Sequence, residues 1–280
     1  LSAGLRRWEA GGAEAQETVS ALSPWRYTPE GAAALAWGLS RVAPGRAPAR
    51  LWEALEADAA RRMGAFPPRA LALLLWARAA EGRGGGGSGD DLLFTALEAE
   101  APRIASDALL IDCAMVLWAL AKRRRRPPPG LVLPWVQRSR ALLERHPACA
   151  RRVATGAQGA PAASGGSRGG AATVGPATAA GAAAVALPSA LMLWSLGRLG
   201  FHPGSPWLRA FFTATAGGQL LGSCTPRQLA MLLWGLAALR EAPPAGWMRE
   251  WRAAWGRAGA AGASDAADQA MVRAALRALR

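Results

Sequence analysis

The sequence predicts an all-α protein, an α-solenoid of stacked helix-turn-helix repeats of about 38–42 residues. A short apolar phrase that ends in tryptophan recurs along the chain, and a proline-containing turn follows most copies. Hydrophobic residues make up 51% of the 280 residues, which is enough for a large core. No apolar run approaches the roughly 18–20 residues of a membrane span, so we expect no membrane partner.

The apolar phrase predicts the first helix of each repeat. Successive tryptophans of the phrase are separated by 39, 42, 76 and 40 residues, and they are Trp37, Trp76, Trp118, Trp194 and Trp234. A degenerate sixth copy has Ala274 in the tryptophan position. In the fifth copy Leu229, Leu232 and Leu236 share one helical stripe, which Trp234 widens. We therefore expect these tryptophans to pack between neighbouring repeats, with base stacking as the alternative.

The turn predicts where the second helix of each repeat begins. Trp207 and Trp247 each follow the preceding tryptophan by 13 residues, just after a proline-containing turn. Proline is tolerated in the first turn of a helix and breaks its interior, so these turns indicate helix starts. Thr28 and Thr225, each followed by proline, are the predicted N-caps of two first helices.

Composition divides the chain into three parts. Residues 1–145 contain the repeats marked by Trp37, Trp76 and Trp118, and residues 186–280 contain the remaining repeats. Between them, residues 146–185 are rich in Ala, Gly, Ser, Thr and Pro and have few large apolar residues. This composition predicts a Gly/Ala-rich flexible insertion.

The net charge of +14 is unevenly distributed. Residues 1–112 contain 12 basic and 14 acidic residues, whereas residues 113–280 contain 21 basic and 5 acidic ones. So basic a segment favours a polyanionic partner such as nucleic acid. All but one of the 33 basic residues are arginine, which a GC-rich genome would also produce. The sign of the charge supports this interpretation, and the choice of arginine does not.

Catalysis and metal binding find no support in the sequence. The three cysteines have no CxxC spacing and there are only two histidines, which argues against a structural zinc site or a disulfide framework. Cys113 and Cys224 lie in or beside apolar helical patterns and are expected to be inert thiols in a reducing compartment. We identify no catalytic residues, metal ligands or cofactor, and expect no small-molecule substrate.

The densest charge is a basic loop in a predicted turn, and it is the strongest candidate for an RNA contact; its residues are Lys122, Arg123, Arg124, Arg125 and Arg126. Five adjacent cations repel one another, and a phosphate-rich partner would relieve that cost. A solvated loop and a nuclear import signal are the alternatives. Further cations extend this patch: Arg138, Arg145, Arg151 and Arg152.

Positions off the apolar stripe of the first helices are further candidates. Four residues after the tryptophan stand Arg41, Lys122 and Arg198, where they either complement the helix dipole or face phosphates. Arg227 and Gln228, at the start of the fifth first helix, complete the predicted RNA-binding set. One residue after the tryptophan every copy has a small residue, which favours close approach of a neighbouring helix over that of a nucleotide.

The phrases Leu117-Trp-Ala-Leu-Ala-Lys122, Leu193-Trp-Ser-Leu-Gly-Arg-Leu-Gly200 and Pro243-Pro-Ala-Gly-Trp247 resemble the octotricopeptide repeat family. The resemblance covers most of residues 20–280 apart from the insertion. It implies an α-solenoid of green-algal type that binds RNA in a mitochondrion or a chloroplast. Members of that family stabilise or activate single transcripts, or hold fragmented ribosomal RNA in algal mitochondrial ribosomes. This chain departs from the family pattern in its second and last repeats and in its insertion.

Three functions follow as hypotheses. The first is a structural RNA-binding protein of a mitochondrial ribosome, with ribosomal RNA and neighbouring ribosomal proteins as partners. The second is a transcript-specific factor that stabilises messenger RNA or promotes its translation. The third is a protein-binding solenoid scaffold, which the nearly neutral residues 1–112 would suit. The chain begins at Leu1, so we expect any targeting peptide to lie outside it.

Overall fold

The structure is a computed structural model that describes residues 27–42, 45, 49–82, 88–123, 126–145, 176–216 and 219–279. In these ranges the regular structure is helical, with 12 α-helices, one short 3-10 helix and no strand. The predicted all-α class is confirmed. Helices from neighbouring repeats pack on one another, and the chain divides into two compact units that we describe separately.

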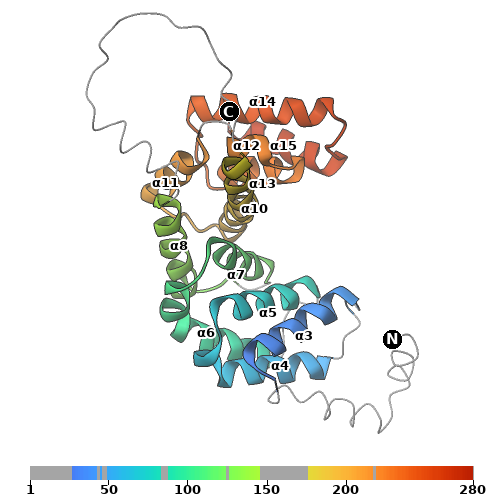
Figure 1. The fold of residues 1–280 in the computed structure, drawn as a ribbon, viewed down its shortest axis with the longest axis vertical. Helices are drawn as coiled ribbons and strands as arrows, with labels where there is room; N and C mark the ends of the chain where they lie inside the picture. The colour runs from blue at the N-terminus through green and yellow to red at the C-terminus, as the bar shows by residue number, and fades with distance from the viewer. Residues whose placement is uncertain are drawn as a thin grey trace, which may run out of the picture. The chain divides into compact units, whose positions relative to one another are not determined.

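Unit 1 comprises Leu1–Asp107 and Lys122–Arg125. Its helices are α3 (Pro29–Val42), α4 (Ala49–Arg61), η2 (Met63–Ala65), α5 (Pro68–Ala80) and α6 (Ser88–Ser106). The first helix α3 packs on the next first helix, α5, and the second helix α4 packs on the next second helix, α6 (Figure 1). Like helices of successive repeats are therefore neighbours in space.

Unit 2 comprises Ala108–Ala121 and Arg126–Arg280. Its helices are α7 (Leu110–Lys122, whose last residue clusters with unit 1), α8 (Pro129–Glu144), α10 (Pro176–Leu199), α11 (Ser205–Thr215), α12 (Gln219–Ser223), α13 (Pro226–Ala238), α14 (Ala245–Ala260) and α15 (Ala266–Ala278). The first helix α13 packs on α10 and on α15. Of the second helices, α8 packs on α11, while the short α12 that follows α11 packs mainly on the first helix α10 and also on α14. The pairing of unit 1 recurs here.

The two predicted threonine caps are present. The hydroxyl Oγ1 of Thr225 accepts a hydrogen bond from the Gln228 amide at 3.3 Å, and the Gln228 side chain accepts one from the Thr225 amide at 2.9 Å. Thr28 Oγ1 accepts from the Gly31 amide at 3.2 Å. Each bond satisfies a backbone N–H group that has no partner within its helix. The threonine N-caps predicted for α3 and α13 are therefore confirmed.

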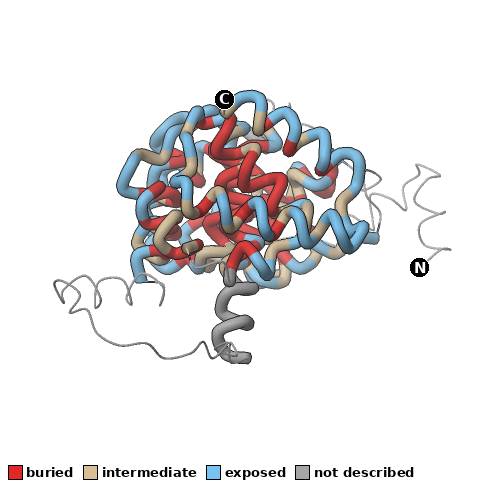
Figure 2. Tube along the Cα trace, turned by 90° about the horizontal axis from the view of Figure 1, so that it is seen from above, coloured by how far each residue is buried: buried red, intermediate tan, exposed pale blue. Residues whose placement is uncertain are grey.

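Tryptophans of the second helices are the centre of the core. Trp52, Trp135, Trp207 and Trp247 are at most 4% exposed. Two of their indole N–H groups donate to a hydroxyl of another helix: Trp207 to Ser139 of α8 at 2.9 Å, and Trp247 to Thr215 of α11 at 3.0 Å. Figure 2 shows the buried turns in red and the outward turns in pale blue. A buried indole N–H usually finds such a partner, although those of Trp52 and Trp135 have none among the described residues, and each of the two bonds links neighbouring second helices.

The tryptophans of the first helices agree with our expectation only in part. Neighbouring repeats do contact through Trp194 and Trp234, whose ring centroids lie 6.2 Å apart. However, none of the five is buried, and Trp37 is 45% exposed. The buried stripe of α13 is made by Leu229, Leu232, Leu233 and Leu236, each at most 1% exposed. The tryptophan lies at the edge of this stripe, so its ring reaches the surface.

The small residue after the tryptophan allows two helices to approach closely. A Cβ on Gly235 would lie 2.5 Å from the backbone carbonyl carbon and oxygen of Leu193 in α10. A Cβ on Gly197 would lie 2.9 Å from the Ala238 Cβ. For the fifth repeat the expectation of helix–helix contact, rather than a nucleotide, is confirmed. This contact sets how the first helices of unit 2 pack.

The insertion is shorter than predicted. Helix α10 begins at Pro176, so the last ten residues of the predicted insertion, 176–185, are helical. Alanine is the best helix former, and the Ala-rich composition of this stretch is compatible with a helix as well as with a linker. Residues 146–175 lie outside the described residues. The two compact units also divide the chain at residue 107, not at the insertion.

Candidate nucleic-acid interface

The basic loop is only partly open to a partner. Lys122 is exposed at the end of α7. The guanidinium of Arg123 lies over the Phe94 ring, 3.4 Å from its centroid, within unit 1. Arg126 donates to the backbone carbonyl of Gly200 at 3.0 Å, just after α10, within unit 2. Arg124 and Arg125 lie outside the described residues.

These contacts give two of the loop cations a structural role as well. An arginine over an aromatic face and an arginine on a helix C-terminal carbonyl are both favourable without any ligand. Arg126 nevertheless stays exposed, and a guanidinium that uses one N–H keeps further donors. The loop therefore remains a candidate phosphate contact.

The cations four residues after the tryptophan lie where the sequence predicted. Arg41, Lys122 and Arg198 are exposed, each in the last turn of its helix. The Arg41 guanidinium lies 5.7 Å from the centroid of the Trp37 ring, one helical turn earlier. A cation at this position interacts favourably with the negative end of the helix dipole. Because the side chain is exposed, it is also accessible to a phosphate.

Three other predicted residues have partners that explain them. Arg227 forms an ion pair with Asp268 at 2.9 Å, and the Asp268 residue is only 4% exposed. Gln228 completes the capping box of α13. Arg138 donates to the Ala108 carbonyl at 2.9 Å. Arg145 is exposed at the end of α8, whereas Arg151 and Arg152 lie outside the described residues.

Helix α14 carries exposed arginines that our sequence analysis did not single out, namely Arg249, Arg252 and Arg257. Trp247, Trp251 and Ala254 bury the opposite side of this helix. Marking the tryptophan-bearing side of α14 as the core would have identified these arginines as surface residues. They add to the cationic surface of unit 2.

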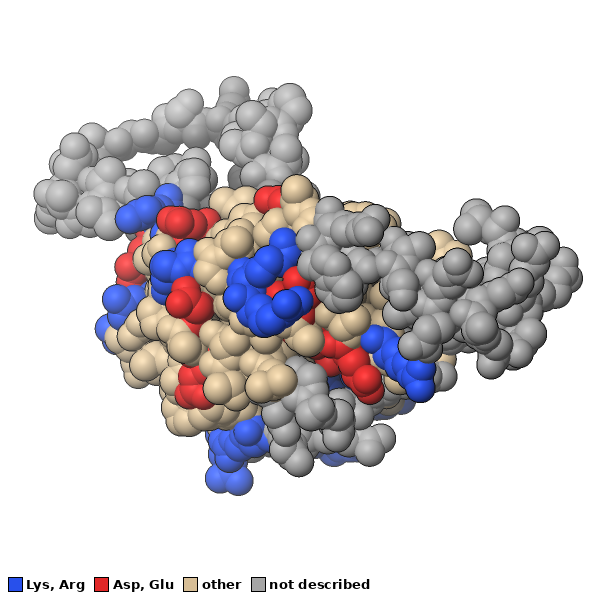
Figure 3. Space-filling view, turned by 90° about the horizontal axis from the view of Figure 1, so that it is seen from below, with Lys and Arg blue, Asp and Glu red and all other residues tan. Residues whose placement is uncertain are grey.

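The two units differ in how their arginines are neutralised. In unit 1 the buried carboxylates of Asp58 and Glu56 pair with Arg62 and Arg78. Unit 2 contains 17 basic and 6 acidic residues, a net charge of +11. On the face drawn in Figure 3, acidic groups stand among the basic ones. The excess positive charge therefore belongs mainly to unit 2.

The described cysteines are poor nucleophiles. Burial, with a contribution from neighbouring Asp112, raises the pKa of the Cys113 thiol to about 12. Burial raises the pKa of Cys224 to about 12 as well. Because the thiolate is the reactive form, neither residue suits nucleophilic chemistry near neutral pH. Within the described ranges no group of three His, Cys, Asp or Glu side chains could hold a metal ion.

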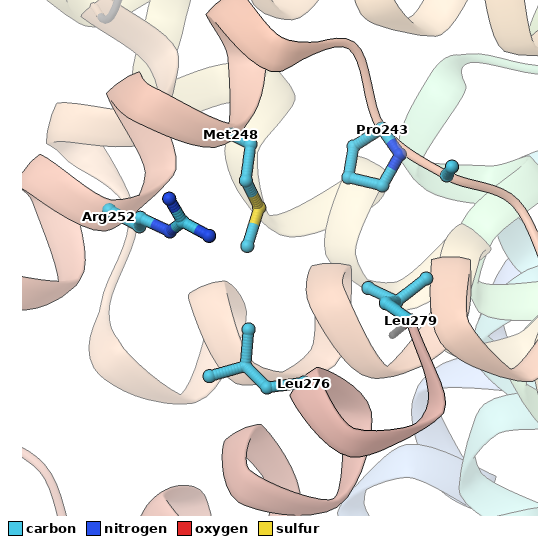
Figure 4. Close-up of a pocket in the computed structure, with 6 residues that line it drawn as sticks. Pro243, Met248, Arg252, Leu276 and Leu279 are labelled. Carbon is cyan, nitrogen blue, oxygen red and sulfur yellow. The ribbon is translucent and has the colours of Figure 1, made fainter.

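Helices α14 and α15 and the loop before α14 line an open pocket of about 320 Å³. Its lining is apolar except for Arg252, and Figure 4 shows Met248 and Arg252 on one side with Leu276 and Leu279 opposite.

None of the described helices is long and apolar enough to cross a membrane.

Comparisons with protein-family models, with curated proteins and with solved structures found no match to this chain. The resemblance to the octotricopeptide repeat therefore rests on the sequence phrases themselves.

Proposed function

We propose that this chain is a non-catalytic RNA-binding α-solenoid of the octotricopeptide type, and that it holds ribosomal RNA in an algal mitochondrial ribosome. The observation that carries the proposal is the net charge of +11 on unit 2, whose exposed cations include Arg126, Arg198 and Arg249. A polyanion relieves the mutual repulsion of such charges and releases its own counterions on binding.

The packing of the helices supports a solenoid. First helices pack on first helices, as in α10, α13 and α15, and second helices pack on second helices, as in α8 and α11. Repeated units in this arrangement bury a continuous core and line equivalent surface residues along one side.

The test is the salt dependence of RNA binding by the whole chain. The logarithm of the binding constant falls linearly with the logarithm of the salt concentration, by about 0.7 for each phosphate contact on a single strand. Replacing Lys122–Arg126 by glutamines is expected to weaken binding and to make this slope shallower by about 1–3.

A matched control removes cations that already have acidic partners. Arg61 and Arg103 are exposed and pair with Asp58 and Glu100 in unit 1, so their replacement by glutamine is expected to leave the slope unchanged. An unaltered slope in the loop variant would remove the loop from the site. Binding that does not change between low and moderate salt would contradict phosphate contacts altogether and favour a protein partner.

Sedimentation tests the ribosomal assignment. A structural ribosomal component is expected to sediment with mitochondrial ribosomal particles and to stay with them at moderate salt. A protein that remains in the light fractions, bound to one messenger RNA, would overturn this part of the proposal.

A further inference from the structure

The open pocket between α14 and α15 lies where the second helix of another repeat would pack. Helix α15 is the first helix of the sixth copy of the repeat, and no described helix follows it. We propose that this pocket is a docking site for an acidic amphipathic helix of another protein, anchored by an aromatic side chain. The inference goes beyond the proposed function, because the ligand is a protein and not a nucleic acid.

The leucines that line the pocket have buried counterparts in the preceding repeat. Leu276 and Leu279 of α15 are only half-buried. Forty residues earlier, Leu236 and Leu239 occupy the same positions of α13 and are at most 9% exposed. Helix α13 packs on the second helix of its own repeat, α14, whereas α15 has no such partner among the described helices. The greater exposure of the α15 leucines is consistent with this missing neighbour.

The other side of the pocket includes a position that receives a tryptophan in the preceding repeat. Trp247 of α14 packs on α11, where its ring centroid lies 5.7 Å from that of Phe212 and 6.3 Å from that of Phe211. Trp251 and Arg252 occupy the equivalent positions of α14, forty residues later. Arg252 lines the pocket, and Figure 4 shows its side chain extending from α14 into the open space. By this equivalence, an incoming second helix places its aromatic side chain beside Arg252.

Charge makes the pocket selective for an acidic partner. A guanidinium binds an aromatic face favourably, and it also binds a carboxylate through two parallel hydrogen bonds. Helices α14 and α15 together carry five arginines and two acidic residues. One of these acids, Asp268, is buried and already pairs with Arg227. Arg249 and Arg273 are exposed within one helical turn of the pocket lining, so the rim is positively charged.

The shape and the lining favour a protein helix over a small molecule or a nucleic acid. The pocket is open and has a volume of about 320 Å³, near the lower limit of sites that enclose a small molecule. Its floor includes Met248, Leu276 and Leu279, whose apolar surface a phosphate backbone cannot use. An amphipathic helix offers apolar side chains at every third or fourth residue, with carboxylates beside them. Such a helix complements both the floor and the rim.

The probe is a second helix of this protein with its charge reversed. It is a fluorescein-labelled peptide of sequence Ala245–Ala260 that carries Arg249→Glu, Arg252→Glu and Arg257→Glu. Its anchor is Trp247, the residue that packs on a preceding second helix. The comparison peptides are the unaltered basic sequence, a scrambled acidic sequence of the same composition, and the acidic sequence with Trp247→Ala. Binding to the whole chain is measured by fluorescence anisotropy.

The ordered acidic peptide is expected to bind about tenfold more tightly than the scrambled one. Both have the same charge, but only the ordered sequence has an apolar stripe with carboxylates beside it. Removal of the tryptophan is expected to weaken binding about tenfold as well, the usual cost of truncating an aromatic anchor. The basic peptide is expected to bind least, because it meets a rim of its own charge.

Variants of the chain locate the site. Arg252→Glu is expected to weaken binding of the acidic peptide about tenfold and to strengthen binding of the basic peptide, a gain that loss of folding cannot produce. The control is Arg209→Glu, which changes the net charge equally at an exposed arginine of α11 that does not line the pocket. Leu276→Ala is expected to weaken the binding of both peptides several-fold, because it removes part of the apolar floor.

The outcomes separate a docked helix from other occupants. Equal binding of the ordered and scrambled peptides, or equal losses in Arg252→Glu and Arg209→Glu, overturns the site and leaves only the attraction of a basic chain for an anion. If Arg252→Glu weakens oligouridylate binding more than Arg209→Glu does, and the ordered peptide has no advantage, the pocket belongs to RNA. Self-association of the whole chain that Arg252→Glu abolishes assigns it to a second copy, which also overturns the proposal. None of these results decides whether the basic loop binds ribosomal RNA, so either proposal can fail alone.

Discussion

Gly235 and Gly38 occupy the same position, one residue after the tryptophan, yet the same substitution is expected to have opposite effects on stability. In a helix interior, replacing glycine by alanine normally stabilises by about 0.5–1 kcal/mol, because alanine loses less backbone entropy on folding. Gly38 of α3 follows this rule, since a Cβ there has no described atom within 4 Å. Gly38→Ala is therefore expected to raise the free energy of unfolding of unit 1 by that amount.

Gly235→Ala meets a backbone that cannot rotate aside. The new Cβ would lie 2.5 Å from the carbonyl carbon and oxygen of Leu193, so α10 and α13 must move apart. Overpacking of this kind costs typically about 1–3 kcal/mol. After the gain in helix propensity is subtracted, we expect a net destabilisation of about 0.5–2 kcal/mol.

Urea denaturation followed by far-ultraviolet circular dichroism measures both variants against the native chain. The two units need not unfold together, so each transition is fitted separately. On heating, a loss of 1 kcal/mol corresponds to a lower midpoint by roughly 2–4 °C for a chain of this size. If Gly235→Ala is as stable as the native chain or more stable, the close approach of α10 and α13 is refuted.

Three further predictions concern buried polar groups. Arg227→Ala is expected to lower the stability of unit 2, because it leaves the buried Asp268 carboxylate without its ionic partner. The Arg227 side chain is 53% exposed, so a double-mutant cycle with Asp268→Asn should give a coupling free energy of only about 1 kcal/mol. A coupling of zero would argue against the ion pair. Cys113 and Cys224 are expected to react with a thiol reagent at pH 8 about a thousandfold more slowly than an ordinary thiol, because a pKa of about 12 in place of 9.0 leaves that much less thiolate. A Cys149→Ser variant isolates these two thiols, and rapid labelling of either in the native chain would contradict the burial. The same raised pKa predicts that stability falls as the pH rises from about 9 towards 12, since the unfolded chain loses these protons first.

The succession of helices could be predicted because it depends on local signals. The proline-containing turns, the threonine caps and the leucine stripe of α13 each act within a few residues, and each corresponds to a described helix or cap. The Ala-rich start of α10 shows where such signals fail. Low hydrophobicity and small side chains do not distinguish a solvated helix from a linker.

The side chains of the candidate interface could be predicted only in part. Charge alone identified Arg126 and Arg227, but their partners, Gly200 and Asp268, are 74 and 41 residues away in the sequence. Nothing local indicates such contacts. The partial burial of Trp234 escaped prediction for another reason. Indole is both large and apolar, so a periodic pattern assigns it to the core, whereas the leucines beside it fill that side of the helix.

The hydrogen bond between Ser139 and Trp207 joins α8 to α11 across the stretch that separates them in sequence. Together with the bond from Arg126 to Gly200, it means that the segments on either side of residues 146–175 are held by non-covalent contacts as well as by the peptide chain. A protease cut within residues 146–175 should therefore yield two fragments that remain associated under native conditions and separate only in denaturant. The same arrangement allows the two pieces to be expressed as separate polypeptides that reassemble.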